Sequence, residues 1–351
     1  MTGLTDRPPA PVRAAVIGYG YGGRTLHVPL INKTRGMEVA TVVTSDPSKV
    51  ALDLPGMKTV RSPEEAFLDE AIDLVVVVTP NETHAPLAEQ ALRHGKHVVV
   101  DKPFTVRSAD AWRLAKLADD CGTTLSVYQS RRWDADFLAV RQVMDSGTLG
   151  DISYFESRLD RYRPVVRDRW RERAEPGAGI WFDLGSHLID QAHQLFGRPQ
   201  AIFADIAAQR RGARADDYFH AILFYDSLRV VLHSTCLAVD DRTRFVLHGE
   251  RGSYVKQGVD PQEAALQIRC VPGGADWGVD KQPGTLTSVD APGISYNGPS
   301  GDYRRFYEGV RDAIRSGGPN PVPAEQGARV IEVIEAGIRS SSSKAVVSLD
   351  H

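Results

Sequence analysis

The strongest constraint on the fold is an alternation of strand-like and helix-like segments between residues 12 and 128. The strand-like segments are short, apolar and rich in β-branched residues, and they lie at 12–18, 37–44, 72–80, 96–103 and 123–129. The segments between them carry helix-start signals, such as Asp46 before Pro47 and a capping box from Ser62 to Glu65. Apolar strands that alternate with helices are typical of a doubly wound parallel sheet. The sequence therefore predicts an α/β fold with a Rossmann domain over residues 12–128.

A different pattern begins at residue 129. A helix expected at 134–146 is followed by longer segments in which apolar and polar residues alternate, at 151–162, 201–210, 218–237 and 243–256. Such alternation is typical of antiparallel strands with one buried face. We therefore expect a C-terminal α+β domain over residues 129–351 and a flexible N-terminal tail over residues 1–11.

The last part of the chain is expected to be mixed. The stretch 272–301 is rich in glycine and proline, which predicts surface loops. Helices are expected at 302–316 and 324–339, before a serine run at 340–343 and a final short strand.

Charge excludes some classes of partner. The formal net charge is −3, so there is no basic field of the kind that holds nucleic acid or an anionic membrane surface. Arginines do cluster at 158–173, but acidic residues are interleaved with them, which indicates a solvated face or a pocket for an anionic ligand. The most apolar run, at 74–78, is too short to span a membrane. With three widely spaced cysteines, no CxxC motif and no signal-peptide pattern, we expect a reduced, cytoplasmic protein.

A glycine motif follows the first strand. Gly18, Gly20 and Gly23 satisfy G-x-G-x-x-G at a strand-to-helix junction, the context in which this motif binds a dinucleotide. Near the end of the second strand, where an acid would bind the ribose of NAD, the chain has Thr44 and Ser45. With Lys49 and Arg24 nearby, these hydroxyls favour NADP over NAD, although NAD remains the alternative cofactor.

Polar residues follow the later strands at the edge where such sheets bind ligands. Lys102 lies at the carboxyl end of the strand expected at 96–103, where a nicotinamide ring is expected; the alternative is an ordinary surface lysine. Asn81 and His84 follow the preceding strand in the same way, although His84 also fits a first-turn helix residue. Asp183 and His187 lie four residues apart; alone, they fit a helix with a structural histidine equally well.

Together these residues could carry out hydride-transfer chemistry. A histidine can take a hydroxyl proton, and a lysine beside the oxygen can polarise it. The chain has no HExxH motif, and the Asp183–His187 pair has no evident third ligand, so we expect no metal.

The sequence resembles the Gfo/Idh/MocA oxidoreductases from about residue 12 to 349, through "GYGYGGRTLHVPLI", "TPNETH", "DKPF" and "GIWFDLGSHLIDQ". The family usually has Glu-Lys-Pro where this chain has Asp101, Lys102 and Pro103. The resemblance implies that His187 is the acid/base, that Lys102 orients and polarises the substrate oxygen, and that Asp183 supports both. It also implies a large, mostly antiparallel C-terminal sheet that forms homodimers or homotetramers.

Within the family, "RRWDADFLAVRQVMDSGTLGDI", "RYRPVVRDRWRE" and "DYFH" are similar to the NADP-preferring scyllo-inositol dehydrogenase branch, except that Gln129 replaces an expected Asn. Tyr162, Trp170 and Arg171 are expected near nicotinamide and substrate, with packing and ion pairing around the cleft as their alternative. The candidate cofactor-binding residues are Gly18, Tyr19, Gly20, Tyr21, Gly22, Gly23, Arg24, Thr44, Ser45, Thr79, Pro80, Asn81, His84, Asp101, Lys102, Gln129, Trp170 and Arg171. The candidate substrate-binding residues are Lys102, Tyr162, Asp183 and His187.

These features predict an NAD(P)-dependent dehydrogenase acting on a secondary hydroxyl of a cyclic polyol or sugar. Two alternatives stay open: a sensor that binds NADP(H) without turnover, and a glycoside hydrolase that oxidises its substrate only transiently. Net reduction of the cofactor separates the dehydrogenase from both.

Overall fold

A computed structural model describes residues 10–240 and 242–349. Residues 1–9 of the expected N-terminal tail lie outside the described residues, while Ala10 and Pro11 have no regular structure. The N-terminal sheet has the order β3-β2-β1-β4-β5-β6, and its strands are all parallel. Its strands are β1 (Val12–Ile17), β2 (Met37–Val43), β3 (Lys58–Val60), β4 (Leu74–Val77), β5 (His97–Val100) and β6 (Leu125–Val127). The predicted Rossmann architecture is confirmed.

One strand of this sheet was not expected. β3 has only three residues, lies at the edge of the sheet and is half exposed, so it lacks the apolar run that marks the other strands. The helical segments are η1 (Gly22–His27), α1 (Val28–Lys33), α2 (Pro47–Asp53), α3 (Pro63–Leu68), η2 (Asn81–Thr83), α4 (His84–Arg93) and α5 (Ser108–Cys121). The capping box is confirmed, because the Ser62 hydroxyl accepts from Glu64 N and Glu65 accepts from Ser62 N, each at 3.2 Å.

The C-terminal sheet has the order β14-β13-β12-β11-β7-β10-β9-β8-β15. Its pairs are antiparallel apart from β7 and β10, which confirms the expected mostly antiparallel sheet. Its strands are β7 (Ile152–Arg158), β8 (Ala201–Ala207), β9 (Tyr218–Phe224), β10 (Arg229–Thr235), β11 (Thr243–Gly249), β12 (Gly252–Gln257), β13 (Gly284–Ser288), β14 (Ala291–Tyr296) and β15 (Val347–Ser348).

Two expectations for this part of the chain are wrong. The stretch 272–301 contains the hairpin β13–β14 in addition to loops; β14 is mostly exposed, so no buried face produces an alternating pattern there. The serine run lies inside the last helix, because Ser340 and Ser341 are buried and their hydroxyls accept from Ala204 N and Ile206 N of β8 at 2.9 and 3.0 Å. These bonds satisfy polar side chains that otherwise favour a helix end.

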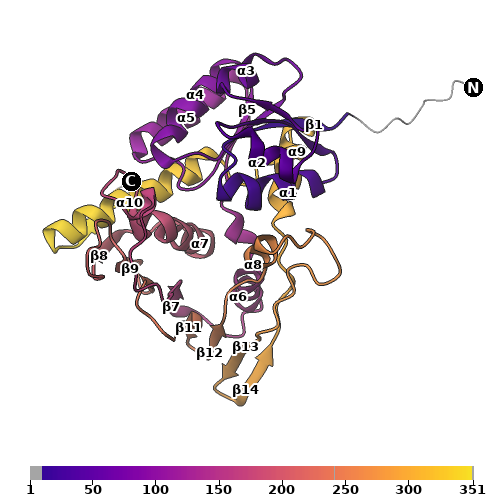
Figure 1. The fold of residues 1–351 in the computed structure, drawn as a ribbon. Coiled ribbons are helices and arrows are strands. Elements are labelled where there is room, and N and C mark those ends of the chain that lie inside the picture. Colours follow the sequence, from indigo (N-terminus) through magenta and orange to yellow (C-terminus); the bar gives the residue numbers. More distant parts are fainter. Residues whose placement is uncertain (1–9, 241, 350–351) are drawn as a thin grey trace, which may run out of the picture.

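Helices on one face of the C-terminal sheet join it to the Rossmann domain (Figure 1). The helical segments of this half are η3 (Ser130–Trp133), α6 (Ala135–Asp145), η4 (Trp170–Glu172), η5 (Trp181–Gly185), α7 (Ser186–Phe196), α8 (Gln262–Gln267), α9 (Arg304–Ser316) and α10 (Ala324–Ser343). α10 packs on both β8 and α5, where Trp112 Nε1 donates to Glu332 at 2.7 Å. Just before α10, Val322 O accepts from Val127 N of β6 at 3.1 Å. These contacts hold the two halves in one arrangement around the site.

The helices were also compared with what a lipid bilayer requires. Within the described residues, no helix combines the length and the apolar character needed to cross a membrane.

Candidate active site

The three motif glycines each have a separate reason to be glycine. Gly18 has φ of +100°, and a Cβ there would collide with the carbonyl oxygen of Val78. A Cβ on Gly23 would collide with the carbonyl oxygen of Gly18, so this residue allows helix and strand to pack closely. A Cβ on Gly20 would meet nothing within 4 Å. Open space at this position is what a pyrophosphate requires, so the loop fits a dinucleotide.

The helix after the glycine loop begins without a cap. It opens with the wide π-helical turn η1, with no acidic residue in that turn and no side chain bonded to its first N–H groups. Arg24 N donates to Gly20 O at 3.0 Å. Free N–H groups and the positive end of the helix dipole attract phosphate. The backbone is therefore arranged to hold an anion here.

A cavity of about 460 Å³ continues from this loop along the ends of β2 and β4. It is lined by Gly18, Tyr19, Gly20, Thr44, Ser45, Asp46, Lys49, Arg61, Thr79 and Pro80, among others. Two of the expected cofactor-binding residues have side chains bonded within the protein. Arg24 forms an ion pair with Asp53 and does not line the cavity, and the Tyr21 hydroxyl donates to Glu263 at 2.8 Å. Arg61 was missed because it follows β3, the strand that the sequence pattern did not reveal.

Lys102 reaches across from the Rossmann domain to the helix that carries Asp183. Its Nζ donates to the Asp183 carbonyl oxygen at 2.6 Å and to Oδ1 of the same residue at 2.8 Å. Lys102 follows β5, whereas Asp183 lies in η5 of the C-terminal half. The two residues singled out by sequence therefore form a direct ion pair at the boundary between the halves of the protein.

Three further candidates shape the loops instead of facing the cleft. His84 is buried, and its ring nitrogens bond the carbonyl oxygens of Pro103 and Thr79, each at 2.9 Å, which matches the alternative of a structural histidine. Asp101 is also buried, and its carboxylate accepts from Lys102 N at 2.8 Å. Asn81 donates to Gly177 O at 2.8 Å, tying the Rossmann domain to the segment before η5.

The Asp183 carboxylate lies among several positive charges. Besides Lys102, Arg161 and Arg171 approach it at 3.6 and 3.7 Å. Burial opposes ionisation of Asp183, but Lys102, Arg171 and Arg161 outweigh it and hold the pKa of the carboxyl well below its usual range. Asp183 is therefore a carboxylate at neutral pH.

His187 lies on α7, one turn beyond Asp183. Its side chain is 6% exposed, and among the described residues Nδ1 has no hydrogen-bond partner. Burial, followed by the positive charges of Lys102 and Arg131, holds its pKa well below the ordinary value. The imidazole is thus neutral at pH 7 and can accept a proton. Asp183 bonds Lys102 and not this ring, so the expectation that it supports both residues is met directly only for Lys102.

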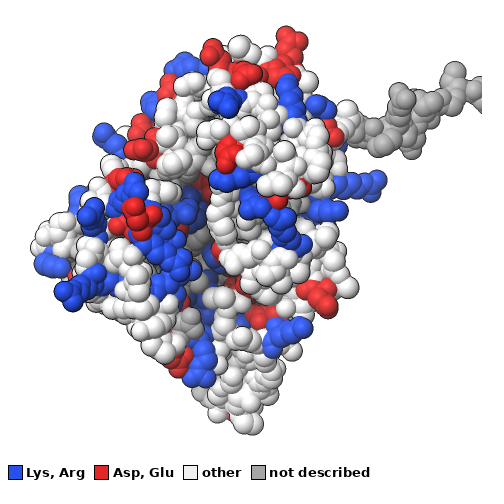
Figure 2. Space-filling model, viewed as in Figure 1, with Lys and Arg blue, Asp and Glu red and all other residues white. Residues whose placement is uncertain are grey.

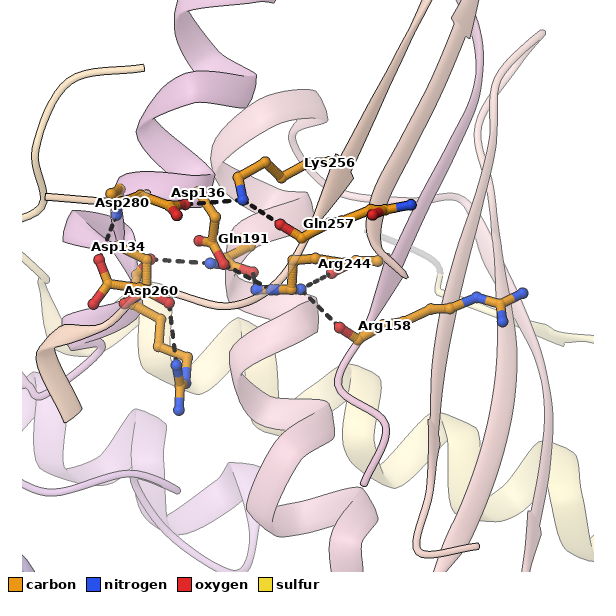
Figure 3. A network of polar contacts seen from close by, with 12 residues as sticks. Asp134, Asp136, Arg158, Gln191, Arg244, Lys256, Gln257, Asp260 and Asp280 are labelled. Carbon is orange, nitrogen blue, oxygen red and sulfur yellow. Dashed lines mark hydrogen bonds and ion pairs between the residues drawn. The ribbon is translucent and has the colours of Figure 1, made fainter. Parts of the chain in front are cut away.

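Two long-range contacts position the helix that carries these residues. The Asp216 carboxylate accepts from Trp181 N at 2.7 Å, and a Cβ on Gly179 would collide with this carboxylate. Behind α7, Arg244 donates to Gln191 at 2.9 Å and to Asp136 at 3.1 Å (Figure 3). Arg244 is fully buried at a bulge in β11, where an extra residue turns its side chain inward.

The remaining candidates differ in exposure. Gln129 is buried, Tyr162 is 56% exposed on the segment after β7, and Trp170 stacks with the Arg171 guanidinium at 4.8 Å. Among residues 10–240 and 242–349, no three His, Cys, Asp or Glu side chains converge as metal ligands would.

Comparison with known sequences decides the family. A family profile described as "Oxidoreductase family, NAD-binding Rossmann fold" matches residues 12–129, and one described as "Oxidoreductase family, C-terminal alpha/beta domain" matches residues 141–349. The chain belongs to the Gfo/Idh/MocA family. It is therefore an NAD(P)-binding oxidoreductase with an NAD-binding Rossmann domain.

Relatives match over nearly the whole chain. The oxidoreductase YdgJ of Escherichia coli (strain K12), which is uncharacterized, is 48% identical over 96% of this chain and 99% of its own. The scyllo-inositol 2-dehydrogenase (NADP(+)) IolW of Bacillus subtilis (strain 168) is 37% identical over 97% of this chain and 96% of its own. A solved oxidoreductase-family structure from Yersinia pestis has a TM-score of 0.93 at 47% identity, covering 98% of each chain.

Proposed function

We propose that this protein is an NADP-preferring dehydrogenase that transfers a hydride between nicotinamide and a secondary hydroxyl of a cyclic polyol or sugar. The observation that carries the proposal is the Lys102–Asp183 pair beside a neutral, buried His187, at the carboxyl end of β5. The site adjoins the glycine loop through Asp101, whose Oδ2 would lie 3.2 Å from a Cβ on Gly22.

The side chains divide the work on the substrate oxygen. Neutral His187 takes the hydroxyl proton during oxidation and returns it during reduction. Lys102, held by Asp183, places a positive charge beside the oxygen and stabilises negative charge that develops there. Nicotinamide, when bound, supplies the hydride acceptor or donor.

The preference for NADP rests on the cavity beyond the glycine loop. Ser45, Lys49 and Arg61 line it, and two of these are cations suited to a 2′-phosphate. The comparison offers both cofactors: IolW is an NADP(+) enzyme, and a scyllo-inositol 2-dehydrogenase (NAD(+)) of Bacillus subtilis is 29% identical over 53% of this chain. We favour NADP because no carboxylate occupies the positions of Thr44 and Ser45 at the end of β2.

The test is spectrophotometric. Purified protein is offered NADP⁺ and NAD⁺ separately with a panel of inositols and aldoses, and absorbance is followed at ~340 nm, where the reduced nicotinamide absorbs. We expect one polyol to be oxidised with net formation of NADPH. Tight cofactor binding without any net reduction would instead favour the sensor or the hydrolase with transient oxidation.

We also propose a homodimer or homotetramer built through the C-terminal sheet. α7 and α10 cover one face of this sheet, while the other face presents half-exposed side chains such as Tyr218, His220 and Phe224 of β9. Sedimentation of the purified protein tests this, and a monomer would contradict it. A cytoplasmic location is proposed as well, because the free thiols of Cys121 and Cys270 are exposed, which fits a reducing compartment.

A further inference from the structure

A pocket beside Asp183 is unusually rich in arginine. It is lined by Arg161, Arg163, Arg169, Arg171 and Arg210, together with the carboxylates of Glu172, Asp183 and Asp216. The first four arginines belong to the cluster that the sequence shows at 158–173, and their acidic neighbours do not balance them all. In the space-filling view, Lys and Arg side chains gather along the hollow between the two halves of the molecule (Figure 2).

The carboxylates of the pocket are already used. Glu172 accepts from Arg169 at 2.7 Å and pairs with Arg210 at 3.1 Å. Arg210 also pairs with the buried Asp217 at 2.8 Å. Asp216 accepts from the backbone of η5, and Asp183 is bonded to Lys102 at 2.8 Å. Asp183 is also shared by Arg161 and Arg171, at 3.6 and 3.7 Å, and no carboxylate of the described residues pairs with Arg163.

Among the described residues the Arg163 side chain therefore has no partner, and Arg161 has one long ion pair, with Asp183 at 3.6 Å. The Arg163 guanidinium makes no hydrogen bond or ion pair within residues 10–240 and 242–349, although its backbone N–H donates to Cys236 O at 2.7 Å. Arg161 Nε is buried without a hydrogen-bond partner in the same part of the chain, and the nearest carboxylate oxygen to this side chain is 3.6 Å away.

The positive charges around Arg163 favour a bound anion. Burial, followed by the repulsion of Arg161, Arg169 and Arg167, lowers the pKa of Arg163. Arg163 is only half-buried, so its guanidinium remains open to a ligand. The planar guanidinium has donors spaced to match a carboxylate or a phosphate.

We infer that the substrate carries an anionic group, a carboxylate or a phosphate ester, which binds to Arg163 and Arg161 while its reacting hydroxyl faces Lys102, Asp183 and His187. The inference rests on the proposed function and narrows its substrate class to sugar or polyol acids and their phosphate esters. Asp183 connects the two parts, because it bonds Lys102 and also lines the arginine pocket.

The experiment compares matched ligands by calorimetry on the protein saturated with NADP⁺. The ligands are glucose, glucuronate and glucose 6-phosphate, so that the carboxylate and the phosphate are tested on one sugar frame. We expect at least one anionic sugar to bind at least about tenfold more tightly than glucose, since a charge-assisted hydrogen bond contributes about that much. The ligand that binds more tightly shows whether the pocket takes a carboxylate or a phosphate.

Substitutions at Arg163 test whether the anionic group binds to this residue. Arg163→Gln is expected to weaken binding of the anionic sugar about tenfold to a hundredfold while leaving glucose unchanged. Arg163→Lys keeps the charge without the planar fork and should lose less. Arg35→Gln removes the same charge from an exposed position on the Rossmann domain and should change nothing. Because the Arg163 side chain makes no internal bond, the variants should fold, and circular dichroism checks this.

The outcomes separate the inference from the proposed function. Equal binding of glucose and the anionic sugars by the wild-type protein would overturn the inference, whatever the variants do. Anion binding that Arg163→Gln leaves intact would overturn it as well. Turnover of neutral polyols without any preference for anionic ones would keep the dehydrogenase and remove the anionic substrate. Binding that depends on Arg163 but produces no NADPH would keep the pocket and contradict the dehydrogenase.

Discussion

The two helices that meet at the site begin in the same way and serve opposite purposes. The helix after the glycine loop and the helix that carries His187 both open with a wide π-helical turn, η1 and η5. Before η1 there is open space at Gly20, and the first turn of η1 contains no acidic residue. At η5 the Asp216 carboxylate occupies the first N–H groups, and Asp183 adds a second carboxylate within the turn.

This difference shows that the same π-helical start can either bind an anion or support catalytic side chains. Where the N–H groups are left free, the backbone itself binds an anion and needs few particular side chains. Where a carboxylate already satisfies them, the turn becomes a rigid support that aims side chains into the cleft. π-helical turns recur at functional sites, and here the protein uses one for each half of the reaction centre.

The largest effect is expected from the second helix. His187→Asn should lower kcat for polyol oxidation about a hundredfold or more, as the loss of a general base does. The affinity for NADP⁺ should stay near that of the wild type, because the glycine loop is unchanged. Steady-state rates and cofactor titration check this, with His94→Asn, an exposed histidine at the end of α4, as the matched control. An equal loss of cofactor affinity would contradict the assignment.

The pH profile sharpens the same assignment. Since burial lowers the pKa of His187, the ring stays neutral and able to accept a proton from neutral pH down to below its ordinary value of about 6.5. Oxidation should therefore hold its rate on acidification to about pH 6.5 and decline only below it. The rate is measured across this range, and a decline centred above pH 6.5 would exclude His187 as the base.

The next prediction concerns the glycine loop that precedes η1. Gly20→Val should raise the dissociation constant for NADP⁺ about tenfold to a hundredfold, because the side chain occupies the space left for the pyrophosphate. The melting temperature should not change, since a Cβ there meets nothing. Gly23→Ala is the contrasting variant, because its Cβ would collide with Gly18 O and destabilise the fold. Normal cofactor binding by Gly20→Val would mean that the pyrophosphate does not lie at this loop.

A smaller effect is expected at the cap of η5. Burial raises the pKa of Asp216 to about 6, so the folded protein binds this proton more tightly than the unfolded chain between about pH 4 and pH 6. The contribution of Asp216 to stability is therefore greatest at the acid end and falls by about 3 kcal/mol as the pH rises through this window. Urea unfolding at several pH values, compared with Asp216→Asn, measures it, and identical pH dependence in both proteins would refute it.

The smallest effect is expected at the far end of the cofactor cavity. Arg61 is exposed, so its contact with a 2′-phosphate is screened by solvent. Arg61→Ala should weaken NADP⁺ binding by about fivefold and leave NAD⁺ binding unchanged. Titration of both cofactors checks this, with Arg93→Ala on α4 as the control. An equal loss of affinity for both cofactors would show that Arg61 does not contact the 2′-phosphate.

Whether a feature could be predicted from the sequence depends on how far apart in the chain the contacting residues lie. The glycine loop and the position of Lys102 after β5 depend on neighbours in the chain, so their pattern was sufficient to predict where they lie. The same holds for the capping box at Ser62. β3 and the hairpin β13–β14 were missed because edge strands that are mostly exposed bury no apolar face.

The tertiary structure alone decided how the site is held and charged. Asp216 caps η5 from 35 residues away, and Arg244 reaches Gln191 across 53 residues. The unpaired state of Arg163 is visible only once the carboxylates around it are seen to bond elsewhere. Local patterns determined the fold class and the glycine loop, because each arises from short-range geometry. Which of those side chains are paired, buried or free is a property of residues distant in the chain, so only folding brings it about.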